Sequence, residues 1–362
     1  MGQAPALPSR EERLALLGKV GKSLLGMPYK SWNFGDSTGF EGILETGRLL
    51  KDPTYFAFAD GWFRAWASRP EPFKPLDCTA PGVAMVEVAL ESGNKEIFES
   101  LNRLASYLMS RPKNRGIYET WETFCLIPPY GGEELPADEA RWLSNPPGGT
   151  CIDCLHFDPP FFTALGKETG NSALIDIGVE QAHAYIDSLQ KENGIFDHFF
   201  MNGVTKTWAP GWGRGQGWAL LGMMDVLKNI SLNHNGRRKI EDAAAKLIYS
   251  MIELQRDDGR WWCVVDSERS GEEGSTAGFM ATGFARAIKL GIVDESIVRP
   301  AMFKALAAVI ADTNSDGELQ NVTAAVFAST RKSHYEFTPR GFSVPWGQGP
   351  VALAICEVDS LL

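Results

Sequence analysis

The chain has 362 residues, of which 44% are hydrophobic and 22% charged, and its net charge is −10 at pH 7. The composition is that of a globular protein, and the acidic balance without a basic run argues against nucleic acid and anionic membrane as partners. No apolar run reaches the roughly 18 residues of a transmembrane helix, and the N-terminus lacks the apolar core of a signal peptide. We therefore expect a cytoplasmic protein, or a secreted one whose signal was removed, that is a monomer or a weak homodimer.

Amphipathic helices recur along the chain, and a Gly at the end of a short polar phrase precedes each of them. These residues are Gly47, Gly93, Gly170, Gly236 and Gly291. Gly suits the left-handed position that ends a helix, and the apolar residues that follow keep the i, i+3, i+4, i+7 spacing of a helix face. Repeated helical hairpins build either an open solenoid or a closed ring.

The spacing of the hairpins is irregular, and long segments rich in Gly, Pro and Trp separate them. An open solenoid usually keeps a tighter period, so we predict a closed all-α ring of about six hairpins. Residues 1–29 are predicted as a helical extension packed on this ring, and residues 30–362 as the ring itself. Few segments resemble strands; residues 261–265 are the best candidate, as part of a short hairpin in a loop.

Two aspartates occupy equivalent places, each between a Pro/Gly-rich loop and an apolar helix. Asp77 follows the sequence PEPFKP, and Asp153 follows the loop of residues 145–150. The simpler interpretation of each is a helix N-cap. In a ring of hairpins both would face one pocket, however, and paired carboxylates are the usual machinery of glycosidic chemistry. Apolar neighbours would also raise the pKa of Asp153 and suit it to acid–base chemistry, so capping and catalysis both stay open.

Residues 207–220, TWAPGWGRGQGWAL, combine three Trp, four Gly, one Arg and one Gln. A sugar ring stacks on flat aromatic faces, a guanidinium pairs with a carboxylate, and Gly lets the walls approach closely. No strand is predicted before this Gly-rich segment, which argues against a phosphate-binding loop. The segment therefore favours a binding site for a sugar acid. His198 lies just before it; an isolated His there would be read as a surface residue in a turn.

Six Cys are scattered along the chain, which is not the pattern of a disulfide scaffold. Cys151 and Cys154 form a C-x-x-C pair with His156 nearby, but a zinc site would need a second pair or a fourth ligand. We therefore predict buried structural thiols and no metal site.

In this order the segments resemble the unsaturated glucuronyl and rhamnogalacturonyl hydrolases of glycoside hydrolase families 88 and 105. The most specific phrase of those families, Trp-x-Arg-Gly-Asn-Gly-Trp, corresponds to residues 212–218. Five further family phrases correspond to residues 77–82, 152–157, 194–198, 273–277 and 347–354. The resemblance runs from about residue 30 to the C-terminus.

The resemblance implies an (α/α)6 barrel that hydrates the double bond of a Δ4,5-unsaturated uronic acid at the end of an oligosaccharide, with rhamnogalacturonan or pectin as the expected source. It implies Asp153 as general acid and base, Asp77 as its assistant, and neither a metal nor an organic cofactor. The residues that it assigns to substrate binding are His198, Trp212, Arg214, Trp218, Phe157 and Gln216.

This chain departs from the family pattern at four of these positions. Cys78 replaces a His, Cys154 replaces the second Asp of the acid phrase, Phe157 replaces Met, and Gln216 replaces Asn. These changes surround the acids and leave the identity of the sugar open. Two other functions are compatible with the sequence: a sugar epimerase or isomerase that uses His for proton transfer, and a carbohydrate-binding ring that keeps the Trp residues without needing Asp153.

Overall fold

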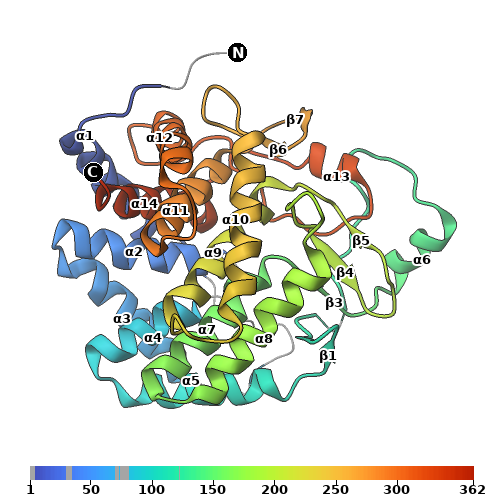
Figure 1. The fold of residues 1–362 in the computed structure, drawn as a ribbon, viewed down its shortest axis with the longest axis horizontal. Helices are drawn as coiled ribbons and strands as arrows, with labels where there is room; N and C mark the ends of the chain where they lie inside the picture. Colours follow the sequence, from blue (N-terminus) through green and yellow to red (C-terminus); the bar gives the residue numbers. More distant parts are fainter. Residues whose placement is uncertain (1–4, 30–34, 70–72, 74–80, 122) are drawn as a thin grey trace.

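The computed structural model describes residues 5–29, 35–69, 73, 81–121 and 123–362. Within these ranges six helices form an inner ring in which each packs against the next, and the last packs against the first (Figure 1). They are α2 (Asp36–Leu50), α4 (Gly82–Ser92), α7 (Cys154–Thr169), α9 (Gly213–Asn229), α11 (Gly274–Leu290) and α14 (Pro345–Asp359). The closed ring confirms the predicted all-α (α/α)6 barrel.

The outer ring consists, in the same described ranges, of helices that alternate with the inner ones along the chain. They are α1 (Arg10–Leu25), α3 (Pro53–Ala67), α5 (Lys95–Met109), α8 (Ser172–Leu189), α10 (Arg237–Glu253) and α12 (Glu295–Ala311). Helix α1 packs against α14 and α2, so it occupies an outer position of the barrel. The boundary at residues 29 and 30 stays a prediction. No helix in the described ranges has the length and apolar character to cross a membrane.

The inner helices are buried on nearly all sides, which explains their tolerance of Gly. A Cβ on Gly222 of α9 would lie 2.3 Å from the carbonyl oxygen of Leu155 in α7. On the other side of the ring, a Cβ on Gly349 of α14 would lie 2.4 Å from the carbonyl oxygen of Thr38 in α2. Gly weakens an isolated helix by about 1 kcal/mol relative to Ala, but here it permits backbones to pack closely.

Three of the five predicted helix-ending glycines are confirmed. Gly93, Gly170 and Gly291 are C-caps with φ of 64°, 67° and 67°. The prediction was wrong at Gly47, which lies inside α2, since the helix ends at the C-cap Lys51. Gly47 instead permits close packing, because a Cβ there would lie 2.8 Å from Cβ of Tyr55 in α3. It was also wrong at Gly236, which precedes α10 as its N-cap.

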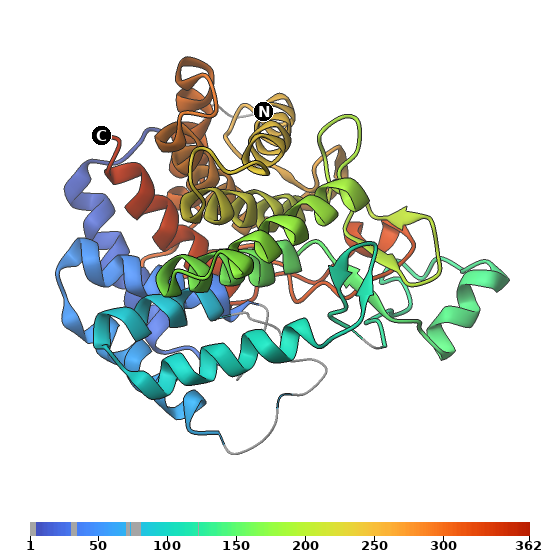
Figure 2. The same cartoon turned by 60° about the horizontal axis from the view of Figure 1, so that its bottom comes forward.

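Short strands lie in the long loops between the helices. The predicted hairpin is confirmed as β6 (Trp262–Val264) paired antiparallel with β7 (Ser267–Glu272). A second hairpin joins β1 (Lys113–Asn114) and β2 (Ile117–Tyr118), and a three-stranded sheet joins β3 (Gly149–Cys151), β4 (Phe199–Met201) and β5 (Thr207–Trp208). Two short helices, α6 (Ala137–Ser144) and α13 (Lys332–Glu336), complete the loops. Strands β1–β5, α6 and α13 gather on one side of the barrel, away from the C-terminus (Figures 1 and 2).

Candidate active site

A small cavity lies where β3 meets α7 and is bordered by the surrounding loops. Its walls are mainly apolar or sulfur-containing, with one carboxylate and one imidazole among them. The lining residues are Thr120, Trp121, Cys125, Cys151, Asp153, Cys154, Phe157, His198, Ala325, Val326 and Phe327. The structure thus brings three of the predicted site residues, Asp153, Phe157 and His198, to one cavity.

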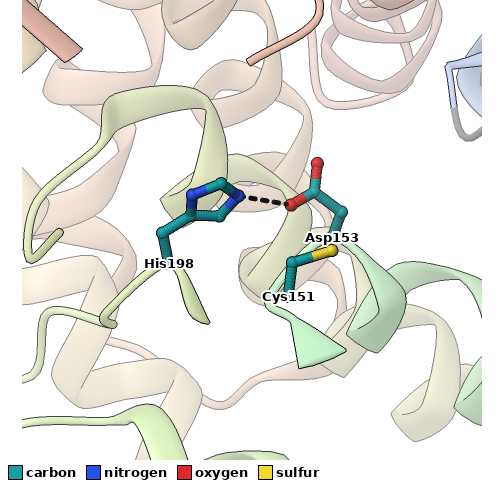
Figure 3. A group of neighbouring side chains, drawn as sticks. All are labelled: Cys151, Asp153 and His198. Carbon is teal, nitrogen blue, oxygen red and sulfur yellow. Dashed lines mark ion pairs between the residues drawn. The ribbon is translucent and has the colours of Figure 1, made fainter. Parts of the chain in front are cut away.

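Asp153 occupies the N-cap position of α7, but its side chain makes no capping hydrogen bond. Its Oδ2 lies 3.4 Å from Nε2 of His198 (Figure 3) and has no hydrogen-bond partner among the described residues. The residue is only 5% exposed. A capping carboxylate would accept a bond from the first helical turn. The capping interpretation is therefore wrong for Asp153, and its carboxylate faces His198 at the cavity wall.

His198 is held beside Asp153 by the backbone of the β3–β4 pair. Cys151 and Phe199 are partners in the register, and the amide of Ile152 donates a 2.7 Å hydrogen bond to the carbonyl of His198. On its other side, Nδ1 of His198 lies 2.6 Å from the hydroxyl of Tyr335. Burial holds the pKa of Tyr335 well above its ordinary value, so the hydroxyl stays protonated.

Tyr335 was not identified from the sequence. It lies in α13, within a short segment that matches none of the motifs, and tertiary packing alone brings it to His198. Aromatic contacts complete this arrangement, since the ring of Trp212 lies 4.5 Å from that of His198.

Arg214 is fully buried in a hydrogen-bonded pair with Glu273, at 3.1 Å. Its guanidinium also donates to the carbonyl of Ala324 at 2.8 Å and to the hydroxyl of Thr323. Glu273 in turn caps α11 by accepting a hydrogen bond from the amide of Thr276 at 3.0 Å. Because residues 325–327 line the cavity, the Arg214 network anchors the segment that leads into its wall.

The other predicted site residues of segment 207–220 pack around the residues that line the cavity. Trp218 packs 5.6 Å from Phe157, and Gln216 exchanges hydrogen bonds of 2.8 and 3.0 Å with the backbone of Phe196. In the part of the chain that the structure describes, Trp212, Arg214, Gln216 and Trp218 are not among the lining residues. Asp77, the predicted assistant, and its neighbour Cys78 lie outside the described residues.

Two groups of side chains among the described residues have donor atoms close enough to share a metal ion, each within 4.8 Å of the others. The first consists of Cys151, Asp153 and His198 in the cavity wall. The second consists of Glu41, His156 and Asp225 between the inner helices. There His156 lies 3.0 Å from Glu41 and 3.7 Å from Asp225.

A cation already neutralises the second group from outside it, because Arg286 donates a 2.7 Å hydrogen bond to Asp225. Arg286 also bonds Glu357, at 2.7 Å. Burial raises the pKa of Asp225, and Arg286 opposes that rise. This network pairs its charges internally, so we interpret it as a structural element of the barrel.

Comparison with known proteins identifies the family of the chain. The sequence profile of Glycosyl Hydrolase Family 88 matches residues 20–362. The chain is 20% identical over 351 residues to the unsaturated rhamnogalacturonyl hydrolase YesR of Bacillus subtilis (strain 168), covering 96% of this chain and 95% of that protein.

Solved structures share the fold. A possible member of the GH105 family from Salmonella enterica superposes with a TM-score of 0.84 at 18% identity, covering 100% of this chain and 97% of that one. The unsaturated glucuronyl hydrolase of Bacillus sp. GL1 superposes with a TM-score of 0.71 at 15% identity, covering 96% and 95%. The chain belongs to Glycosyl Hydrolase Family 88 and is a glycoside hydrolase.

Proposed function

We propose that this enzyme removes a Δ4,5-unsaturated uronic acid from the non-reducing end of oligosaccharides that polysaccharide lyases produce, with rhamnogalacturonan or pectin products as the preferred class. The observation that carries the proposal is the carboxyl group of Asp153. It makes no capping hydrogen bond to α7 and is buried beside His198 in a largely apolar cavity. The relative YesR, an unsaturated rhamnogalacturonyl hydrolase, supports the substrate class.

In the proposed reaction Asp153 gives a proton to C4 of the enol ether, and the positive charge that develops at C5 is shared with the ring oxygen. Water then adds at C5 and returns a proton to Asp153. The resulting hemiketal opens to a C5 ketone, and the hemiacetal at C1 then releases the alcohol of the neighbouring sugar. The glycosidic bond thus breaks as a consequence of hydration, and the acid is regenerated.

The surroundings of Asp153 suit a group that alternates between acid and base. His198 lies within reach of its carboxyl oxygen, and the Tyr335 hydroxyl at 2.6 Å fixes the orientation of the imidazole. A low-polarity wall strengthens the interaction between the carboxyl group and the cationic transition state. We assign Phe157 and His198 to direct substrate contact and Asp77 to assisting Asp153.

We assign Trp212, Arg214, Gln216 and Trp218 to positioning the wall. Their side chains are buried, and the hydrogen bonds of Arg214 and Gln216 are made within the protein. For Arg214 this differs from a direct bond to the substrate carboxylate, which would require Arg214 to leave Glu273.

The test is to incubate the protein with lyase-generated unsaturated disaccharides and to follow the ultraviolet absorbance of the conjugated double bond. The proposal predicts loss of this absorbance with release of the neighbouring sugar, abolished in Asp153→Asn and retained in the matched surface control Asp187→Asn, whose side chain is 65% exposed. An epimerase would change the sugar while leaving the double bond, and a binding protein would change neither. No loss of absorbance with pectin, rhamnogalacturonan and glycosaminoglycan products would overturn the proposal.

A further inference from the structure

The cavity wall contains a thiol that the proposed hydration does not use. Cys151 ends β3, two residues before Asp153, and its Sγ lies within 4.8 Å of both the Asp153 carboxylate and the His198 imidazole (Figure 3). We propose that Cys151, Asp153 and His198 form a binding site for a zinc-like divalent metal ion, and that the bound ion inhibits the enzyme.

The spacing of the oxygen and nitrogen donors fits such an ion. Two ligand atoms bound about 2.0–2.1 Å from a tetrahedral zinc ion lie about 3.3–3.4 Å apart. Asp153 Oδ2 and His198 Nε2 are separated by 3.4 Å. This separation is long for a hydrogen bond, and Oδ2 is a buried atom without a hydrogen-bond partner among the described residues. An ion between the two atoms would satisfy both.

The backbone holds the ligands before any ion arrives. Cys151 and His198 lie on neighbouring strands whose register pairs Cys151 with Phe199, and Asp153 begins the helix that follows β3. The hydroxyl of Tyr335 binds Nδ1 of His198 and leaves Nε2 facing Asp153. A second hydrogen bond of this kind is what usually orients a metal-ligating His.

The donor set selects the class of ion. A thiolate and an imidazole suit zinc and related transition metals, whereas Mg²⁺ and Ca²⁺ prefer oxygen ligands. Three protein ligands leave a fourth position for water or substrate, which the cavity supplies. Binding would release the thiol proton to the buffer, since Cys151 binds as the thiolate, and the affinity would therefore rise with pH.

A metal bound at this site blocks the proposed chemistry, because a carboxylate that coordinates the ion cannot deliver a proton to C4. Inhibition therefore rests on the proposed role of Asp153, whereas metal binding does not. The nearby thiol of Cys154 lies 3.7 Å from Cys151 Sγ, and both are free thiols. Because oxidation could join such neighbours, the experiment is done with a non-thiol reductant that keeps both reduced.

The experiment titrates the full-length protein with Co²⁺, which reports thiolate ligation through a charge-transfer absorption band, and with Zn²⁺ by calorimetry and by competition for that band. We expect one ion per chain, no binding of Mg²⁺, and Zn²⁺ inhibition that a chelator reverses. Cys151→Ser should lose the band and weaken Zn²⁺ binding at least about tenfold. The matched control Cys356→Ser, which removes a buried thiol near the C-terminal end of α14, should bind like the wild type.

The inhibition of each variant by Zn²⁺ is expressed relative to the rate of the same variant without metal. A wild-type protein without the band, or a Cys151→Ser variant that keeps it, would overturn the metal site. A band together with full activity at saturating Zn²⁺ would overturn the inhibition. A band in a protein that leaves every unsaturated oligosaccharide unchanged would refute the proposed function and support the metal site.

Discussion

Asp153 and Asp225 are both buried aspartates beside a histidine, and they differ in the partner that holds the carboxylate. Asp225 receives a 2.7 Å hydrogen bond from Arg286, whereas the ion-pair partner that the described residues give Asp153 is His198, at 3.4 Å. A fixed guanidinium makes a carboxylate part of the scaffold, since it fixes the position of the oxygen. The Asp153 carboxyl group instead faces the imidazole of His198 at the cavity wall. We propose that this difference separates the acid of the reaction, Asp153, from the acids that only stabilise the barrel.

The largest effects are expected when each aspartate is neutralised in turn. Asp153→Asn should lower kcat at least about 10³-fold, because the proton donor is lost, while the free energy of unfolding stays equal or rises. Asp225→Asn should keep kcat within a few-fold and lower the free energy of unfolding by about 2 kcal/mol or more, because Arg286 loses one of its two carboxylate partners. Initial rates and urea unfolding of both proteins check this, and an equal loss of activity in the two variants would refute the distinction.

The second test removes the cation itself. Arg286→Met leaves Asp225 buried without its cation and removes one of the two partners of Glu357, so the free energy of unfolding should fall by about 3–5 kcal/mol. Activity of the protein that remains folded should be unchanged within a few-fold. Chemical unfolding at pH 7 gives the first quantity and active-site-normalised rates give the second. An unfolding curve that matches the wild type would show that this network does not stabilise the barrel.

The cavity region and the charged network should lose stability in two separate pH ranges. Near the cavity, burial lowers the pKa of His334 to about 4 from 6.5, so the unfolded chain takes up a proton that the folded chain resists. Stability should therefore fall as the pH decreases from 6.5 to 4, by about 2–3 kcal/mol. His334→Gln should remove this slope in unfolding experiments at several pH values. A slope that persists in the variant would assign it to other groups.

The second pH range is more acidic and belongs to the charged network around Arg286. Burial acts to raise the pKa of Glu357, but Arg286 and Lys289 outweigh it and lower the pKa to about 2 from 4.5. Since the folded-state pKa is depressed, the stabilisation is present above pH 4.5 and is lost as the pH falls toward 2. Glu357→Gln should flatten the decline in this range and leave the range of His334 unchanged, which the same unfolding series measures.

The smallest expected effect concerns Tyr335. Tyr335→Phe removes the hydroxyl that binds His198 and keeps the ring, so we expect about a tenfold loss of kcat/KM and a shifted pH profile, because the imidazole is less firmly oriented. A purely structural role would lower stability and leave the shape of the profile unchanged. The full pH profile of kcat/KM distinguishes these outcomes.

The barrel could be predicted from the sequence because its signal is local: apolar spacing, Gly caps and long loops recur along the chain. Asp153 could be singled out for the same reason, since its phrase is continuous. The interpretation of Arg214 as a carboxylate partner followed from its residue type, and the sequence could not reveal that Glu273 and Thr323 surround it. Tyr335 is distant in sequence from every site motif, so only the folded chain brings it to His198. The charged network around Arg286 likewise joins residues from five inner helices and has no local signature.

Deuterium incorporation tests most directly whether Asp153 protonates C4. The reaction is run in D₂O with an unsaturated disaccharide, and the product is analysed by NMR. If Asp153 protonates C4 from solvent-exchanged acid, the product should carry one deuterium at C4 and a ketone at C5, and Asp153→Asn should form neither. Release of the neighbouring sugar with the double bond still present, or with no deuterium at C4, would contradict the account.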